Sequence, residues 1–453
     1  MGTYLIQNPH HEYASRFIRL IRERYGHRPI AFFTRSAKEC FYRKQECLPD
    51  REFAAIYEVD AGDLDRFAAR LREKHRDIEG IIPYSEETLQ LTAALQERLG
   101  LGWHDPASLA RFRHKSALKD HLRRVSPSLR LNGAWKVASA ADVFALEQWL
   151  PHKFILKPDS GFGSRGIAVF MAHQRDAVSR LFERAPDVYV LEEFLEGTLY
   201  ALDGIVDGSG DVLVASVFSS GRRAVNGCPV VYANGALVHE DTPLFHELAG
   251  YGREVLRAAG LRRSPFHLEV MRDSRGPCLI DLGARLVGHS HAFTCERVHG
   301  GAFDFFGLAA AGYFGKPVDL KLSYHRYNRV QSVKVYGASE VGGMAYAVNG
   351  VEQVEALPSF DRWIVKPRPG LALHRTVDLF TVPYSLVLMG AREGEALIEV
   401  GEQVHRMLRI HTDAPALDRI RIGGQVFARK VGKKLGWMSE QARRSLRRAV
   451  RPS

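Results

Sequence analysis

The first hundred residues alternate short apolar runs with longer amphipathic stretches. The apolar runs are TYLIQ, PIAFF and FAAIYEV, and the amphipathic stretches cover residues 11–25 and 64–74. Short apolar runs are typical of buried strands, and apolar residues three or four apart are typical of helices. The alternation predicts βαβ units around a parallel sheet. Residues 79–102 repeat the order strand, turn and helix, with Ser85 as N-cap and Gly100 at the helix end.

A smaller α+β unit is predicted next. Residues 104–125 form a basic helical stretch that ends at a Ser-Pro pair, because proline does not continue a helix. The runs WKVAS, KFILKP, GIAVF and VYVLEEF then predict strands, with helices after Ser139 and near residues 175–184. The centre of this unit is a glycine-rich turn between two strands.

Beyond Gly197 the pattern predicts two hairpins and a further α+β stretch. ALDGIVD and VLVASVF flank the polar GSGD, and FHLEVM and PCLIDLG flank RDSRG. A helix is expected near residues 245–259. In residues 320–410 the runs RWIVKP and YSLVLMG are separated by Pro and Gly.

Composition and charge narrow the class of protein. The 453 residues are 45% hydrophobic and 25% charged, with no apolar run near the roughly 18 residues that a membrane helix needs. A net charge of +11 suits nucleic-acid binding, but residues 418–453 alone hold eleven Lys or Arg against two acids. The basic character therefore belongs to a tail, and the body resembles an ordinary enzyme.

The cysteines and the N-terminus indicate a compartment. The five cysteines are odd in number, scattered and without a CxxC pair, which argues against a disulfide framework and a structural zinc. The N-terminus lacks the basic and apolar regions of a secretory signal and is expected to be part of the fold. We therefore expect a cytoplasmic protein.

The glycine-rich turn is the first candidate for chemistry. In KFILKPDSGFGSRGIAVF, Lys157 ends a strand and a turn rich in glycine precedes the next strand. Glycines let backbone N–H groups approach phosphate oxygens, and a lysine supplies a positive charge. A plain hairpin turn is the alternative. The dinucleotide fingerprint and the GxxxxGKS loop are excluded, because both require a helix at this point.

A second and a third candidate follow along the chain. VLEEFLEG ends a strand at Glu192 and Glu193, where backbone groups can face a base edge, although a plain strand end is the commoner explanation. Glu269 and Asp281 each lie on an apolar strand of the second hairpin. Two converging acids suggest magnesium holding phosphate oxygens, and Arg285 is placed to neutralise an anion. The alternative is a salt bridge between Arg285 and one of the acids.

Two other groups of residues are weaker candidates. Residues 288–301 contain three histidines, Cys295 and Glu296, but in no defensible zinc spacing, and are expected to line an acceptor pocket. Arg222 and Arg223, in a connection after VFSS, are candidates to close on phosphates, with a solvated loop as the commoner explanation.

The order of these pieces resembles the ATP-grasp superfamily over residues 1–320. RFRHKSALKDHL also resembles the first helix of that superfamily, in which a lysine meets phosphate. GARLVG and residues 320–410 are similar to the branch of L-amino-acid ligases and related carboxylate–amine ligases. The resemblance implies α/β and α+β structure, as an ATP-grasp fold with an N-terminal βαβ (pre-ATP-grasp) domain and a C-terminal α+β extension. The boundaries it suggests are an N-terminal domain 1–112, a lid subdomain 113–197, a central subdomain with the metal site 198–319, an extension 320–412 and a basic tail 413–453.

The resemblance also implies a role for each site residue. Lys115 and Lys157 would hold the ATP phosphates, Arg285 and Lys157 would act in catalysis, and Glu269 and Asp281 would bind Mg²⁺ or Mn²⁺. The loop closing over the phosphates would contain Ser160, Gly161, Gly163, Ser164 and Gly166. The groups contacting adenine would be Glu192 and the backbone of Glu193, Phe194 and Leu195.

Two positions depart from the superfamily pattern. Thr198 and Leu199 follow the hinge glycine, where an acid often holds the ribose hydroxyls, and Asp203 is a candidate substitute. Gly283 stands where many members have an asparagine metal ligand. We expect altered metal coordination with activity retained.

The predicted function is an ADP-forming carboxylate–amine ligase that makes an amide or peptide bond through an acyl phosphate. Its substrates are expected to be a small amino-acid-like carboxylate and an amine, and a homodimer is allowed. Alternatives are a biotin-dependent carboxylase and a non-catalytic nucleotide-binding module tethered by its tail. The tail is a candidate to contact an acidic partner or an anionic surface, and a solvated terminal helix is the commoner explanation.

Overall fold

The computed structural model describes residues 2–9, 11–35, 37–38, 50–146, 152–161, 163, 165–185, 187–288, 290–301 and 303–412. Ser164, His289 and the basic tail beyond residue 412 lie outside these ranges. The predictions about the tail therefore stay predictions. Among the described helices, none is both long and apolar enough to cross a membrane.

The N-terminal segment folds as the predicted parallel sheet. Its strands lie in the order β3-β2-β1-β4, and every neighbouring pair is parallel. Alternate residues of β1 and β2 face two separate cores, so both faces of the sheet are buried, which explains the nearly continuous apolar runs. The elements are β1 (Thr3–Gln7), α1 (His11–Tyr25), β2 (Ile30–Thr34), η1 (Asp50–Glu52), β3 (Ala55–Val59), α3 (Leu64–Lys74) and β4 (Ile78–Ile82).

The helix predicted after Ser85 begins with a tighter turn. Ser85 and Thr88 form a capping box around η2 (Glu86–Thr88), which leads into α4 (Leu89–Leu99). Gly100 ends the helix in the left-handed conformation, with φ at 72°. A residue without a Cβ adopts this conformation at little cost, so the predicted helix end is confirmed.

Two helices stand where one was predicted in residues 104–125. α5 (Pro106–Arg113) and α6 (Lys115–Val125) meet at His114, whose backbone is extended. The N–H groups of Lys115 and Ser116 donate to the backbone oxygen and the carboxylate of Asp159, at 3.1 and 2.8 Å. The first N–H groups of a helix lack partners inside it. The prediction of one helix was wrong because Asp159, more than forty residues away, provides a new helix start.

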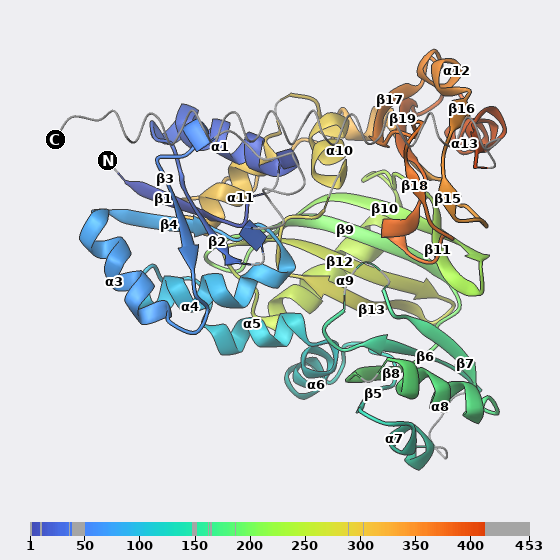
Figure 1. Ribbon diagram of the computed structural model, residues 1–453, viewed down its shortest axis with the longest axis horizontal. Helices are drawn as coiled ribbons and strands as arrows, with labels where there is room; N and C mark the ends of the chain where they lie inside the picture. The colour runs from blue at the N-terminus through green and yellow to red at the C-terminus, as the bar shows by residue number, and fades with distance from the viewer. Residues whose placement is uncertain are drawn as a thin grey trace.

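The strands and helices predicted for the small α+β unit are present, and they form an antiparallel sheet flanked by two helices (Figure 1). This unit lies within the segment proposed as the lid subdomain, called the lid below. Its strand order is β5-β8-β6-β7, with neighbouring strands antiparallel. The elements are β5 (Ala134–Val137), α7 (Ala140–Ala145), β6 (Lys153–Pro158), β7 (Ala168–Met171), α8 (Arg175–Arg184) and β8 (Tyr189–Glu193). The glycine-rich turn joins β6 to β7, and Lys157 stands near the end of β6.

One eight-stranded sheet joins the central subdomain to the extension. The strand order is β13-β12-β9-β10-β11-β14-β19-β17, and β11 pairs with β14 from Asn234 to Ala236. Strands from both sides of the boundary proposed at residue 320 therefore belong to one sheet. The strands are β9 (Thr198–Val206), β10 (Val212–Val225), β11 (Cys228–Ala236), β12 (Ser264–Asp273), β13 (Gly276–Gly283), β14 (Val330–Tyr336), β17 (Phe360–Val365) and β19 (Ser385–Ala391).

Helices cover this sheet and connect it to the N-terminal sheet (Figure 1). α9 (Pro243–Ala259) buries its apolar side against β9, β12 and β13. α10 (Ser290–His299) and α11 (Phe305–Tyr313) join the core between the two sheets. The remaining elements belong to the extension: η4 (Tyr327–Arg329), β15 (Gly343–Met344), β16 (Ala347–Asn349), α12 (Val351–Glu355), β18 (Ala372–Leu373), η5 (Leu379–Thr381), α13 (Leu397–Met407) and β20 (Arg409–His411).

Candidate active site

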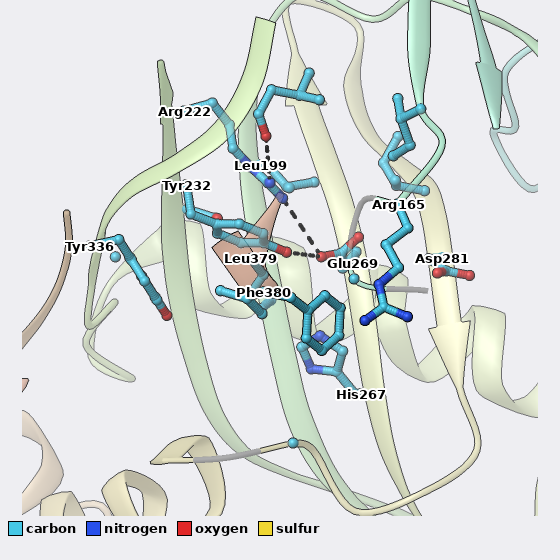
Figure 2. Close-up of a pocket in the computed structure, with 18 of the residues that line it drawn as sticks. Arg165, Leu199, Arg222, Tyr232, His267, Glu269, Asp281, Tyr336, Leu379 and Phe380 are labelled. Atoms are coloured by element: carbon cyan, nitrogen blue, oxygen red, sulfur yellow. Dashed lines mark hydrogen bonds and ion pairs between the residues drawn. The ribbon is translucent and has the colours of Figure 1, made fainter. Parts of the chain in front are cut away.

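A pocket of about 1120 Å³ lies where the lid, the central sheet and the extension meet. Predicted site residues from distant parts of the chain line it, including Lys115, Lys157, Glu269, Asp281 and Arg285. Figure 2 shows that Glu269 and Asp281 stand on neighbouring strands at one side of this pocket. The tertiary structure thus brings the glycine-rich turn, the strand end at Glu192 and the acidic hairpin into one cavity.

Glu192 holds two lysines in the wall of the pocket. Its carboxylate accepts from Lys157 at 2.9 Å, is paired with Lys119 at 2.8 Å and accepts from the amide of Asn132 at 3.1 Å. Burial alone would raise the pKa of Glu192, but the two lysines outweigh burial and lower the pKa to about 2. A charged Glu192 therefore positions Lys157 and Lys119, and its carboxylate is engaged before any base arrives.

The backbone after Glu192 lines the pocket, and its N–H and carbonyl groups already make some hydrogen bonds within the protein. The N–H of Glu193 donates to Gly133 at 2.9 Å, and its carbonyl accepts from Asn132 at 3.1 Å. A carbonyl oxygen has a second lone pair, so this group can accept one more hydrogen bond. Phe194 and Leu195 also line the pocket. This segment can therefore offer a base edge an acceptor and apolar contacts.

The glycine-rich turn is tied to the start of α6. The ammonium of Lys115 donates to the carbonyl of Gly161 at 2.6 Å and lies 3.3 Å from Asp281. Gly163 and Gly166 have φ of 66° and 68°, the left-handed region that favours glycine. Gly163 lines the pocket, and Ser160 is half-buried beside it. Lys115 thus links the turn to the carboxylate pair.

The carboxylate pair fits a divalent cation. Glu269 and Asp281 are direct partners across the β12–β13 hairpin, and both remain open to the pocket, with side-chain exposures of 19% and 29%. Tyr232 donates to Glu269 at 3.2 Å. Among the described residues no group of three or more His, Cys, Asp or Glu side chains can hold a metal. Carboxylate oxygens suit Mg²⁺, whose remaining ligands in such sites are phosphate oxygens and water.

Arg285 and Arg222 both line the pocket. Arg285 pairs with Glu86 of η2 at 3.1 Å, so the alternative of a salt bridge with Glu269 or Asp281 is not what the structure has. Arg222 lies on β10, stacks 3.5 Å from the ring of Tyr232 and is 3.8 Å from Glu269 (Figure 2). The expectation of a solvated connection was wrong, because residues 212–225 form a paired strand.

Two expectations about the histidine-rich region are corrected. Asp203 is fully buried and faces His267 at 2.7 Å and His291 at 3.4 Å, so it offers no surface to ribose hydroxyls. His299 is stacked on Tyr327 and bonded to the carbonyl of Ala215, a packing role. His291 does line the pocket, as the acceptor-pocket expectation required of this segment.

Several residues in or behind the pocket wall were missed from the sequence. Lys119, which lies behind the wall and pairs with Glu192, follows Lys115 by four residues on one helix. This spacing places both lysines on one face and was a usable signal. Tyr232 and Lys334, by contrast, enter the pocket from strands whose pairing no local pattern reveals.

One pocket is lined by two lysines, the glycine-rich turn, the strand end at Glu192 and the acidic hairpin. The lysines are Lys115 and Lys157. Residues 150–292 match the family model described as an ATP-grasp domain. This stretch of the chain is similar to an ATP-grasp domain. The fold of the chain is the ATP-grasp fold, with an N-terminal α/β sheet and an extension.

Similar proteins and solved structures match more of the chain than the family model does. Dapdiamide A synthase of Enterobacter agglomerans is 28% identical over 256 residues, which are 53% of this chain and 58% of the relative. The chain thus spans just over half of that relative. An L-amino acid ligase from Bacillus licheniformis superposes with a TM-score of 0.72 at 15% identity, covering 91% of this chain and 99% of the other. Biotin carboxylase from Campylobacter jejuni, solved as a β-γ-ATP complex, superposes with a TM-score of 0.61 at 14% identity, covering 91% of this chain and 92% of the other.

Proposed function

We propose that this protein is an ATP-dependent ligase that joins a carboxylate to an amine and releases ADP and phosphate. The observation that carries the proposal is the convergence of Lys115, Lys157 and the pair Glu269–Asp281 on one pocket that extends beyond them to the extension. The names of two similar proteins, a synthase of dapdiamide A and an L-amino acid ligase, support the same reaction class.

The reaction has two balanced steps. A carboxylate oxygen attacks the γ-phosphorus of ATP, the bond to the β-phosphate oxygen breaks, and an acyl phosphate and ADP result. An amine nitrogen then attacks the acyl carbon, and the amide forms as phosphate leaves with the proton that the nitrogen loses. Such transfers depend on positioning and charge neutralisation. In this pocket Lys115, Lys157 and Arg285 would supply the positive charge.

Mg²⁺ or Mn²⁺ would be held by Glu269 and Asp281 and would neutralise phosphate charge when bound. Tyr232 and Arg222 keep Glu269 in place by direct contacts. Burial raises the pKa of Tyr232 to about 12, so its hydroxyl stays a donor at neutral pH. The glycine-rich turn between β6 and β7 would cover the acyl phosphate and keep water away.

A screen of ADP release tests the proposal. The full chain is incubated with ATP, Mg²⁺ and amino acids singly and in pairs, and the product is identified by mass spectrometry. We expect ADP release that requires an added amine, together with a new amide. Release that requires bicarbonate and biotin would instead assign a carboxylase, and ATP binding without any turnover would assign a binding module.

A variant of the proposed metal site tests the role of its carboxylates, and a surface variant of the same kind is the matched control. Asp281→Asn removes one charge at nearly constant shape, so we expect turnover to fall at least about a hundredfold with the fold intact. Asp120→Asn, at an exposed position of α6, should keep the wild-type rate. Equal rates for Asp281→Asn and the wild type would exclude the metal role of this carboxylate.

A further inference from the structure

The inner end of the pocket contains a lysine that the proposed chemistry does not use. Lys334 lies on β14 and is 1% exposed, yet it lines the pocket. Its ammonium has no hydrogen-bond partner among the described residues and lies 3.9 Å from the ring centre of Phe218. A buried charge without a hydrogen-bonded partner is costly. This arrangement therefore calls for a function.

The carboxylate that interacts with Lys334 is shared with two histidines. Asp203 faces His267 at 2.7 Å and His291 at 3.4 Å, and it makes no hydrogen bond to Lys334. Asp203 already serves His267, whose pKa rises, because the attraction of Asp203 outweighs burial. Asp203 is thus the one carboxylate that interacts with His267, His291 and Lys334 among the groups named here. We infer that a second anion can bind beside Lys334.

We propose that Lys334 binds the carboxylate of the amine substrate and so selects amines that carry one. The inference rests on the proposed ligase function and assigns a residue to its acceptor site. A carboxylate at Lys334 would form a charge-assisted hydrogen bond inside a low-dielectric wall, which is where such bonds are strongest. Phe218 and His291, which also line this end, would contact the rest of the substrate.

One strand separates this subsite from the proposed metal ligand. Lys334 lies over Phe218 of β10, and β9 alone lies between β10 and β12, which carries Glu269. Neighbouring strands are ~4.8 Å apart, so the backbones of β10 and β12 stand on the order of 10 Å apart. A small amino acid spans this distance with its amine toward the acyl phosphate.

The charge state of Lys334 makes the subsite sensitive to pH. Burial lowers the pKa of Lys334 to about 7, with Arg362 adding to the effect and Asp203 opposing it. The groups that face it are Asp203 on β9, His291 and the thiol of Cys295 on α10, and Arg362 on β17. Because only the protonated lysine attracts a carboxylate, recognition by the free enzyme should weaken as pH rises through about 7.

Three chains and paired substrates test the assignment. Wild type, Lys334→Met and Lys334→Arg are compared by ADP release at saturating ATP and donor, with L-amino acids and their carboxamides as amines. We expect Lys334→Met to lower kcat/KM for the acids by about ten- to a hundredfold through KM. The carboxamides should change less than about threefold, and Lys334→Arg should keep part of the preference. The advantage of wild type over Lys334→Met should shrink as pH rises above 7.

The outcomes distinguish this inference from the ligase proposal. An equal loss for acids and carboxamides would show a structural role. The donor is also varied at a saturating amine, and a loss confined to the donor KM would assign the anion to the donor. Either result overturns the inference and leaves the ligase standing. If no amine promotes ADP release, the ligase proposal fails by itself. The amino-acid-dependent rise in melting temperature of the ADP–Mg²⁺ complex then decides the role of Lys334, because only wild type should show it.

Discussion

Individual side chains in the pocket wall are held by charge balance more than by packing. Glu192 has no exposed surface and sits between Lys119, Lys157 and Asn132. Each lysine is itself nearly buried, so the carboxylate is the group that allows two positive charges to remain there. Removing one member of such a cluster costs far more than the net value of the interaction, because the others are left unpaired.

Glu192→Gln should therefore destabilise the fold by about 3–5 kcal/mol at neutral pH. The native pKa of about 2 lies below the ordinary value of 4.5, so the stabilisation by Glu192 is present above about 4.5 and is lost as pH falls toward 2. Denaturant melts of both proteins across this range measure the difference. The gap between them should narrow on acidification, and a gap that is constant with pH would contradict the charge argument. Glu193→Gln, at the neighbouring carboxylate that is partly exposed and paired with Arg275 at the surface, is the control.

At the scale of elements, the glycine-rich turn of the lid meets the extension. The guanidinium of Arg165 lies 4.0 Å from the ring centre of Phe380 in η5, and the two side chains approach each other in Figure 2. A Cβ added to Gly163 would meet the same ring, and the φ of 66° at this position itself favours glycine. The turn therefore rests on η5 through a cation–π contact and a close approach at Gly163.

Phe380→Ala should loosen this contact and lower kcat/KM for ATP about two- to fivefold, the equivalent of the ~0.5–1 kcal/mol of an exposed cation–π pair. Phe380 is 46% exposed, so the melting temperature should change little. Steady-state kinetics with ATP varied provide the measurement. Val377→Ala, at a similarly exposed neighbour, should behave as wild type. An effect of the same size in Val377→Ala would assign the loss to the segment as a whole.

At the scale of the whole molecule, one sheet continues from the acidic hairpin into the extension. β11 pairs with β14, and β14 carries Lys334 into the pocket. The pocket is therefore completed by residues far beyond the ATP-grasp match, which ends at residue 292. The strongly basic residues 418–453 follow all of these elements in the chain.

A chain ending at Leu417 should keep its ligase rate, because every residue placed in the pocket precedes that position. It should lose any salt-sensitive association with anionic vesicles or nucleic acid, since the tail holds most of the net charge. Rates and co-sedimentation at two salt concentrations check both statements. A folded truncation without activity would show that the tail contributes to the active site.

The sequence by itself determined many of the local elements and, through the order of its motifs, predicted the fold. Periodicity located α1 and α3 at their observed bounds, and glycine marked the turn after β6, because these signals depend on neighbouring residues. Motif order was enough to predict the ATP-grasp fold. The separation of α5 from α6 was decided by Asp159, a contact distant in sequence.

Only the tertiary structure decided which polar residues share a wall of the pocket. Asp203 appeared as a ribose ligand in the sequence and proved to be buried between two histidines. Lys334 and Tyr232 carried no local signal, because their positions in the pocket follow from the strand order of the large sheet. Register and strand order are set by long-range pairing, and a pattern of neighbouring residues contains no record of them.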